Sequence, residues 1–271
     1  MLKERLISAL ILAGTISLLI LFLRDEYLIF FLAFISCLSF WEFIKVRFTN
    51  IISLLCLFIF ALLLVISHLT FFNYLFIVLS VILYLTSSLF ILSFPLNKNL
   101  LQHSLTWSLT GFITHLGFFA AIQQIISSED LSYLSLNIEN QRFLILYIIL
   151  ISILMDSLAY FAGKSLGKRP FITNVSPNKT MEGFLIAILA APLFLIAVSE
   201  NIFEFSTFLV FLVLLVVSMF SVIGDAFASM MKRVIGVKDF SNLIPGHGGL
   251  FDRLDSHIAA FPCFIFLLKF L

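Results

Sequence analysis

The sequence has few charged residues. Of its 271 residues only 11% are Asp, Glu, Lys or Arg, while 62% are hydrophobic. Soluble domains carry about 25% charged and about 45–50% apolar residues, so this chain has too little polar surface for a water-soluble fold. A disordered chain is excluded as well, because segments this apolar bury themselves. The composition indicates a membrane protein whose informative residues are the few polar ones.

Cysteine is also scarce, and the charges are balanced. The three cysteines, Cys37, Cys56 and Cys263, lie in apolar runs and show no paired spacing. This argues against a disulfide framework and against a zinc site. The formal net charge of +1 gives no general attraction to nucleic acid, and we expect no nucleic-acid partner.

Long apolar runs fill most of the chain. A membrane-spanning helix needs about 20 mainly apolar residues. We therefore predict an all-α polytopic integral membrane protein with about 8–9 transmembrane helices, the first of them retained rather than cleaved as a signal peptide. We expect one continuous membrane unit, with N-terminal helices in 1–140 and the catalytic region in 141–271. The runs lie near residues 6–23, 27–44, 50–67, 71–94, 104–126, 141–163, 184–199, 205–224 and 258–271.

Charge asymmetry predicts the orientation in the membrane. With a cytoplasmic amino terminus and one crossing per run, the inner segments are 1–5, 45–49, 95–103, 164–183 and 225–257. They hold thirteen of the 16 Lys and Arg residues, and cytoplasmic segments of membrane proteins carry such an excess. We expect a polar site that faces the cytoplasm, and a bacterial inner (plasma) membrane is the simplest location.

Two polar segments, 156–183 and 225–257, contain most of the groups that could do chemistry. In the N-terminal half the polar pair Trp41-Glu42 stands out, and we expect Glu42 to be an ordinary interfacial residue. Asp156 lies inside an apolar run, where an acid costs about 2.5–3.5 kcal/mol and should face a cavity, a cation or a partner. A structural acid paired with a buried Lys or hydroxyl is the alternative for Asp156.

The rest of the first segment is rich in groups that suit phosphate. Residues 160–169 combine glycines with Lys164, Lys168 and Arg169, although they do not form a Walker loop. A positive-inside anchor would explain these charges equally well. Residues 176–183 are predicted to be a turn that leads into a helix.

The second segment gives a stronger signal. If residues 224–236 are helical, Asp225, Ser229 and the pair Lys232-Arg233 share one stripe that should line a hydrated cavity. Residues 245–249 form a glycine-rich turn whose N–H groups can hold anionic oxygens. Asp252 and Asp255 then stand three residues apart on one helical face.

Carboxylates that converge from two helices are ligands for a hard cation such as Mg²⁺. Lysine and arginine beside them suit phosphate groups. Together these are the parts needed for phosphoryl or nucleotidyl transfer, in which a substrate oxygen can be the nucleophile.

Residues 229–255 resemble the signature of the phosphatidate cytidylyltransferases, also called CDP-diacylglycerol synthases. The stretches 156–167 and 176–183 and the pair Gly224-Asp225 resemble other motifs of that family. The resemblance covers the C-terminal half. It implies a phospholipid-biosynthesis enzyme that converts CTP and phosphatidate to CDP-diacylglycerol and pyrophosphate.

The family resemblance also implies roles for individual residues. The metal ligands would be Asp225 and Asp252, with Asp156 and Asp255 close by, and Mg²⁺ is the expected cofactor, with a second cation left open. The expected partners are CTP, phosphatidate and the lipid bilayer, and a homodimer is left open. The expected catalytic residues are Asp225, Asp252, Lys232, Arg233, Lys238 and Asp255. The expected substrate-binding residues are Ser229, Lys179, Asn178, Lys164, His247, Gly248, Gly249 and Arg253.

Other classes of membrane protein give different patterns. A CTP-dependent lipid or polyprenol kinase shares the apolar architecture but should lack the long signature. A CDP-alcohol phosphotransferase would carry an Asp-Gly-x2-Ala-Arg stretch, which is missing here. An ion-coupled transporter predicts broken helices in both halves of the chain, whereas these polar residues crowd into one half.

Overall fold

Helices make up most of the chain that the structure describes. The computed structural model describes residues 14–127, 142–199, 206–244 and 248–270, and residues 14–22 are helical. The elements that follow are α2 (Asp25–Lys45), α3 (Asn50–Ile66), α4 (Thr70–Ser93), α5 (Lys98–Gln102), α6 (Ser104–Ile126), α7 (Arg142–Leu166), β1 (Pro170–Ile172), β2 (Ser176–Thr180), α8 (Met181–Ser199), α9 (Thr207–Ile235) and α10 (Phe251–Leu268).

The helices confirm a polytopic membrane protein. Five described helices, α2, α4, α6, α7 and α9, are long and apolar enough to cross a membrane, and α3 and α8 are shorter apolar helices. Large apolar side chains lie on the outside of the bundle, as Ile51, Phe58 and Val65 do on α3. Outward apolar side chains are expected where lipid replaces water as the solvent. The expected total of eight or nine crossings stays a prediction, and most of the first run lies outside the described residues.

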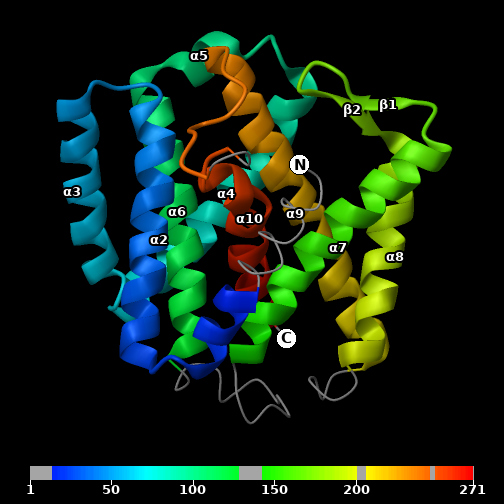
Figure 1. Cartoon of the computed structure of the whole chain (residues 1–271), viewed down its shortest axis with the longest axis horizontal. Helices are drawn as coiled ribbons and strands as arrows, with labels where there is room; N and C mark the ends of the chain where they lie inside the picture. The colour runs from blue at the N-terminus through cyan, green and yellow to red at the C-terminus, as the bar shows by residue number, and fades with distance from the viewer. Residues whose placement is uncertain (1–13, 128–141, 200–205, 245–247, 271) are drawn as a thin grey trace.

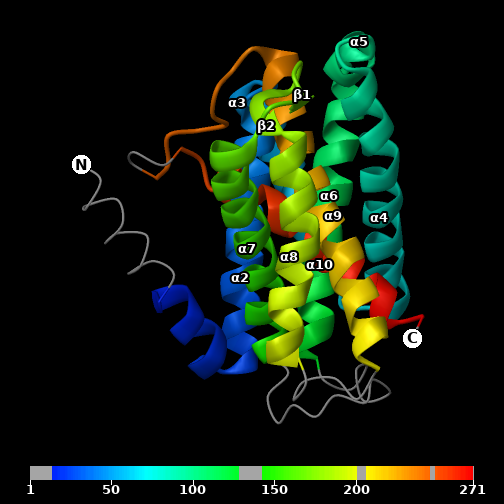
Figure 2. The same ribbon diagram turned by 90° about the vertical axis from the view of Figure 1, so that its right-hand side faces the viewer.

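The connections between helices separate onto two ends of the bundle. α5, the β1–β2 hairpin and the C-terminal end of α9 share one end, and α2 begins at the opposite end (Figure 1 and Figure 2). Of the segments that the charge pattern assigns to the cytoplasm, 95–103, 164–183 and the end of α9 therefore lie at the same end of the bundle.

α10 is the central helix of the bundle. It packs most closely against α9 and also contacts α2, α4, α6 and α7. Figure 1 shows that α9 ends at the top of the bundle, whereas α10 begins lower down, inside the bundle. α9 finishes at Gly236, whose left-handed φ of 76° closes the helix. The chain then runs inward to α10, which carries the signature residues into the interior.

The hairpin departs from the all-helical expectation. Residues 176–183 are predicted to be a turn that leads into a helix. The helix is α8, which begins at Met181, but residues 176–180 form the strand β2, which pairs with β1 in antiparallel register. Pro170 opens β1 and Pro177 lies in β2, and proline disfavours a continuing helix but is tolerated in edge strands. The hairpin carries Asn178 and Lys179 toward the helices beside it.

Candidate active site

Lys179 joins the two polar segments that the sequence singled out. It projects from β2 and forms an ion pair with Asp225 of α9. Burial disfavours the charge on Lys179, but Asp225, with Asp156 of α7 and Asp255 of α10, outweighs that effect. The pKa of Lys179 therefore lies above its ordinary value. Lys179 thus pairs with Asp225 and is influenced by carboxylates on two further helices. We call Asp156, Asp225 and Asp255 the carboxylate cluster.

Ser256 links two members of the carboxylate cluster. Its hydroxyl lies 3.4 Å from an oxygen of Asp156 and 3.4 Å from an oxygen of Asp255. Asp255 is 9% exposed, whereas Asp156 is exposed and lines a cavity. Asp156 therefore lines a cavity, as expected for an acid in an apolar run, and it also meets the Ser256 hydroxyl, as the structural alternative expects. Its role in the site stays a prediction.

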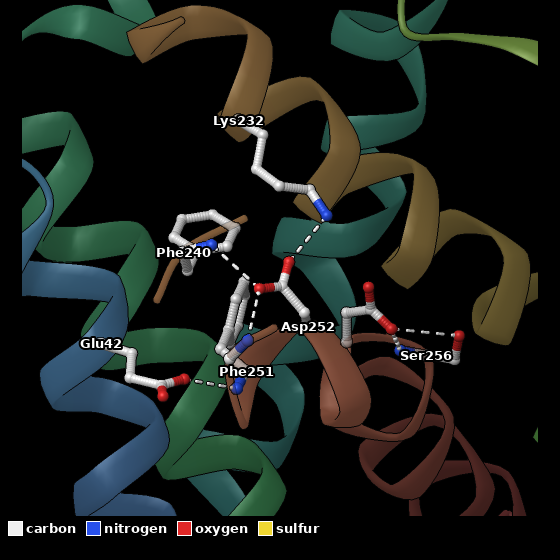
Figure 3. Close-up of polar contacts among 8 residues, drawn as sticks. Glu42, Lys232, Phe240, Phe251, Asp252 and Ser256 are labelled. Atoms are coloured by element: carbon white, nitrogen blue, oxygen red, sulfur yellow. Dashed lines mark hydrogen bonds and ion pairs between the residues drawn. The ribbon is translucent and has the colours of Figure 1, made fainter. Parts of the chain in front are cut away.

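Asp252 makes a separate set of contacts, drawn in Figure 3. One carboxylate oxygen lies 2.8 Å from the ammonium of Lys232. The other oxygen accepts hydrogen bonds from the backbone N–H of Phe240, at 2.9 Å, and of Gly249, at 3.1 Å. Asp252 therefore ties the end of α9 and the chain before α10 to the first turn of α10.

The structure pairs two of the four predicted metal-ligand acids with a lysine each. Asp225 faces Lys179 and Asp252 faces Lys232, so both carboxylates are neutralised. Within the described part of the chain, no three acidic, His or Cys side chains come together closely enough to hold a metal ion. The carboxylate oxygens remain the right kind of donor for a hard cation, and the metal-ligand roles stay predictions.

The interpretation of Glu42 as an ordinary interfacial residue was wrong. Its side chain is buried at the C-terminal end of α2, and both oxygens are engaged by the chain that leads into α10. A signal was present in the sequence, because Glu42 is an acid inside an apolar run. Such an acid is costly unless it is paired, which predicts a buried partner for Glu42 as it does for Asp156.

A cavity of about 480 Å³ lies beside the carboxylate cluster. Four predicted site residues, Asp156, Lys164, Asn178 and Lys179, line it together with aromatic and small side chains. Val222 is the residue of α9 that lines the cavity. The polar stripe of α9 (Asp225, Ser229, Lys232 and Arg233) is predicted to line a cavity, but its residues are not part of this wall. The other lining residues are Ala159, Tyr160, Gly163, Phe171, Thr180 and Phe184.

Of the remaining predicted site residues, Ser229 and Arg233 lie on α9, Lys238 follows α9, and Arg253 lies on α10. The Arg233 guanidinium donates to the backbone carbonyl of Val175, at 3.2 Å, which fixes the hairpin against α9. Ser229 is half-buried, and Lys238 and Arg253 are exposed. The chemistry predicted for these four residues stays a prediction.

The predicted glycine-rich turn is described only in part. Gly248 has a φ of 90°, in the left-handed region that favours glycine. The N–H of Gly249 is directed to Asp252 rather than left open to an anion. His247 lies outside the described residues.

Gly224 allows the close packing of α9 and α10 next to the carboxylate cluster. A Cβ at this position would lie 2.5 Å from the backbone oxygen of Asp255 and 2.8 Å from Cβ of Ala259. Neither atom belongs to a flexible chain end, so Gly224→Ala must push the two helices apart. We expect a loss of about 1–3 kcal/mol in stability and at least a tenfold loss of the activity proposed below. Thermal unfolding in detergent and turnover measure the two effects.

Gly14→Ala is the matched control for Gly224→Ala. A Cβ at Gly14 meets no atom within 4 Å, so this variant should keep wild-type stability and turnover. If Gly224→Ala had the melting temperature and turnover of the wild type, the close packing of α9 against α10 at Gly224 would not be needed for stability or activity.

Comparison with known proteins gives the same family as the signature. Residues 3–271 match the sequence model of a protein family that is described as "Cytidylyltransferase family". The phosphatidate cytidylyltransferase of Bacillus subtilis is 44% identical over 117 residues, covering 42% of this chain and 42% of that protein. That of Haemophilus influenzae is 41% identical over 133 residues (47% and 46%), and that of Helicobacter pylori strain J99 is 38% identical over 127 residues (47% and 47%). The matched stretch spans less than half of each relative.

Proposed function

Because the match runs through residues 3–271, this chain belongs to the cytidylyltransferase family, and we propose that it is a membrane-embedded phosphatidate cytidylyltransferase. It would convert CTP and phosphatidate to CDP-diacylglycerol and pyrophosphate. One observation carries the proposal: Lys179, paired with Asp225, lines a cavity that also presents Asp156, Lys164 and Asn178. The relatives named above are bacterial phosphatidate cytidylyltransferases.

The reaction needs positioning and charge stabilisation rather than a covalent protein nucleophile. An oxygen of the lipid phosphate attacks the α-phosphorus of CTP. The bond from that phosphorus to the α,β-bridging oxygen breaks, and pyrophosphate leaves with the bonding electrons. Groups that hold both phosphates in line lower the barrier to such a transfer.

The cavity offers matching groups for a phosphorylated lipid. Lys164 and Lys179 suit phosphate oxygens, and the Asn178 amide can donate a further hydrogen bond. Tyr160, Phe171 and Phe184 supply the apolar part of the wall, which suits the glycerol and the first carbons of the acyl chains. The lipid would enter from the bilayer, and CTP would reach Lys232, Arg233 and Lys238 from the cytoplasmic end.

Magnesium is the cofactor that this chemistry requires. When bound, Mg²⁺ would neutralise charge on the triphosphate oxygens. Asp156, Asp225 and Asp255 are the residues that would hold it, because their carboxylate oxygens suit a hard cation and all three carboxylates act on the charge of Lys179; they would have to move closer together than they lie in the structure to share one ion. Asp252 would serve by holding Lys232, since both its oxygens already have partners.

The proposed function is tested with purified protein in detergent, CTP, phosphatidate and Mg²⁺. We expect CDP-diacylglycerol and pyrophosphate in equal amounts. We also expect removal of divalent cations with EDTA to abolish turnover, and excess Mg²⁺ to restore it, because the triphosphate charge must be compensated. Full turnover in EDTA would contradict the magnesium requirement. Absence of product from folded protein across several detergents and divalent cations would contradict the function itself.

The site is proposed to face the cytoplasm of a bacterial plasma membrane. CTP is a cytoplasmic nucleotide, and the hairpin that carries Lys179 lies at the end of the bundle where the predicted inner segments gather (Figure 2). Labelling a single cysteine placed in the hairpin, in intact cells and in inverted vesicles, would test this orientation.

A further inference from the structure

Glu42 reaches from the N-terminal half of the chain to the signature residues. Its Oε1 accepts a hydrogen bond from the Ser241 hydroxyl at 2.5 Å, and its Oε2 accepts one from the backbone N–H of Phe251 at 2.8 Å. The residue is only 5% exposed. Ser241 lies within the connection from α9 to α10 and Phe251 begins α10, so one carboxylate holds the middle of the connection and the start of the helix.

Ser241 contacts both Glu42 and a later residue of the connection. Its hydroxyl oxygen accepts a hydrogen bond from the backbone N–H of Leu243 at 3.0 Å. Beyond it, Ile244 and Gly248 exchange two backbone hydrogen bonds, at 2.9 and 3.2 Å. The contact between Glu42 and Ser241 is therefore followed along the chain by two local sets of hydrogen bonds, Leu243 to Ser241 and Ile244 with Gly248.

Gly249 lies between Glu42 and Asp252. A Cβ on Gly249 would be 2.8 Å from Oε2 of Glu42 and 3.0 Å from Oδ2 of Asp252. The N–H of Gly249 donates to that same Asp252 oxygen. The position of Glu42 thus limits where Gly249 can lie, and Gly249 helps to orient the carboxylate that holds Lys232.

Aromatic packing strengthens the same junction. Phe43, next to Glu42 on α2, stacks on Phe240 with ring centroids 5.6 Å apart and meets Phe251 edge-on at 5.2 Å. Phe240 and Phe251 also contact each other at 4.7 Å. Figure 3 shows Glu42, Phe240 and Phe251 on the side of Asp252 away from Ser256.

We propose that Glu42 is a positioning residue for the transfer reaction: it fixes the connection into α10 and, through Gly249 and Phe240, the orientation of the Asp252–Lys232 pair. This inference rests on the proposed function. Glu42 touches no substrate in this account. Loss of the Glu42 carboxylate leaves the Phe251 N–H and the Ser241 O–H without the acceptors that they have in the structure, which lets the connection rearrange.

The test compares Glu42→Ala, Glu42→Gln and Ser241→Ala. In Glu42→Gln the amide oxygen can accept from Phe251 and the amide N–H can donate to Ser241, so the geometry is kept without the charge. We expect kcat to fall about 100-fold in Glu42→Ala, because a displacement of about 1 Å can cost that much. We expect a fall of less than fivefold in Glu42→Gln and an intermediate fall in Ser241→Ala, with KM for CTP changing less than threefold in all three.

Asp25→Ala is the matched control, because it removes a different acidic side chain of α2 that also has a partner elsewhere in the chain. Asp25 pairs with Arg142 at the opposite end of the helix, so this variant should keep wild-type kcat. Wild-type kcat in Glu42→Ala would overturn the proposal. A Glu42→Gln variant as inactive as Glu42→Ala would also overturn it, because the charge rather than the hydrogen bonds would then matter.

Hydrogen exchange separates this inference from the proposed function. Backbone amides in peptides covering 240–251 should exchange at least tenfold faster in Glu42→Ala than in wild type, and near the wild-type rate in Glu42→Gln. If wild type turns over no CTP and phosphatidate, the proposed function fails while this measurement still reports on the Glu42 contact. Unchanged exchange in Glu42→Ala would overturn the positioning role whatever the activity.

Discussion

Replacing Asp225 by Asn should lower turnover of CTP and phosphatidate by at least about 1000-fold, the upper range for removal of one group that stabilises transition-state charge. Asp225 is the ion-pair partner of Lys179 and one of three carboxylates around it. An amide in its place cannot balance the ammonium or bind a cation with a full charge. The measurement is the rate of CDP-diacylglycerol formation at saturating CTP and Mg²⁺.

The Asp225→Asn result has two controls. Asp25→Asn makes the same substitution at the Arg142 pair, away from the carboxylate cluster, and should leave turnover near wild type. Thermal unfolding should show that Asp225→Asn is folded, because Asn has nearly the same size and Asp156 and Asp255 remain near Lys179. Activity within tenfold of wild type in a folded Asp225→Asn protein would remove Asp225 from the reaction.

Replacing Asp252 by Asn should lower turnover by about 100- to 1000-fold for a different reason. The Asn oxygen can still accept from the N–H groups of Phe240 and Gly249, but its NH₂ group then faces the Lys232 ammonium, donor against donor. We expect the connection into α10 to be kept while Lys232 loses its partner and moves. Turnover and hydrogen exchange over 240–251 are measured together.

Comparison with Asp252→Ala separates the two roles of this carboxylate, the ion pair with Lys232 and the hydrogen bonds from the connection into α10. It removes the acceptor for both N–H groups as well as the charge, so it should also lower the stability, by about 3–5 kcal/mol for loss of one partner of a buried ion pair. If Asp252→Asn and Asp252→Ala showed equal stability and equal exchange, Asp252 would not hold the connection. If Asp252→Asn kept wild-type turnover, the Lys232 pair would not matter for the reaction.

Local features of the fold could be predicted from the sequence. The helix through 224–236 is the end of α9, and its glycine at 236 closes it with a positive φ, as a C-terminal glycine does. The i, i+3 pair Asp252 and Asp255 lies on α10 as predicted. These features depend on residues within a few positions of one another, which is the range over which helical periodicity and capping act.

Contacts between distant residues could not be predicted in the same way. Lys179 and Asp225 are 46 residues apart, and Glu42 and Phe251 are 209 residues apart. Nothing in local periodicity says which lysine meets which acid, so Asp225 and Asp252 were grouped as one ligand set, whereas each has its own lysine. The N-terminal half, expected to contribute only apolar spans, supplies the carboxylate that fixes the connection into α10.

The central claim is that this chain transfers a cytidylyl group to a lipid phosphate, and the fate of a labelled phosphate tests it directly. Purified protein is incubated with phosphatidate and Mg²⁺ and with CTP labelled at either the α- or the γ-phosphate. We predict that the α-label enters the lipid fraction as CDP-diacylglycerol, while the γ-label appears only in pyrophosphate. Transfer of the γ-label to lipid, with none of the α-label, would show a CTP-dependent lipid kinase and would contradict the account.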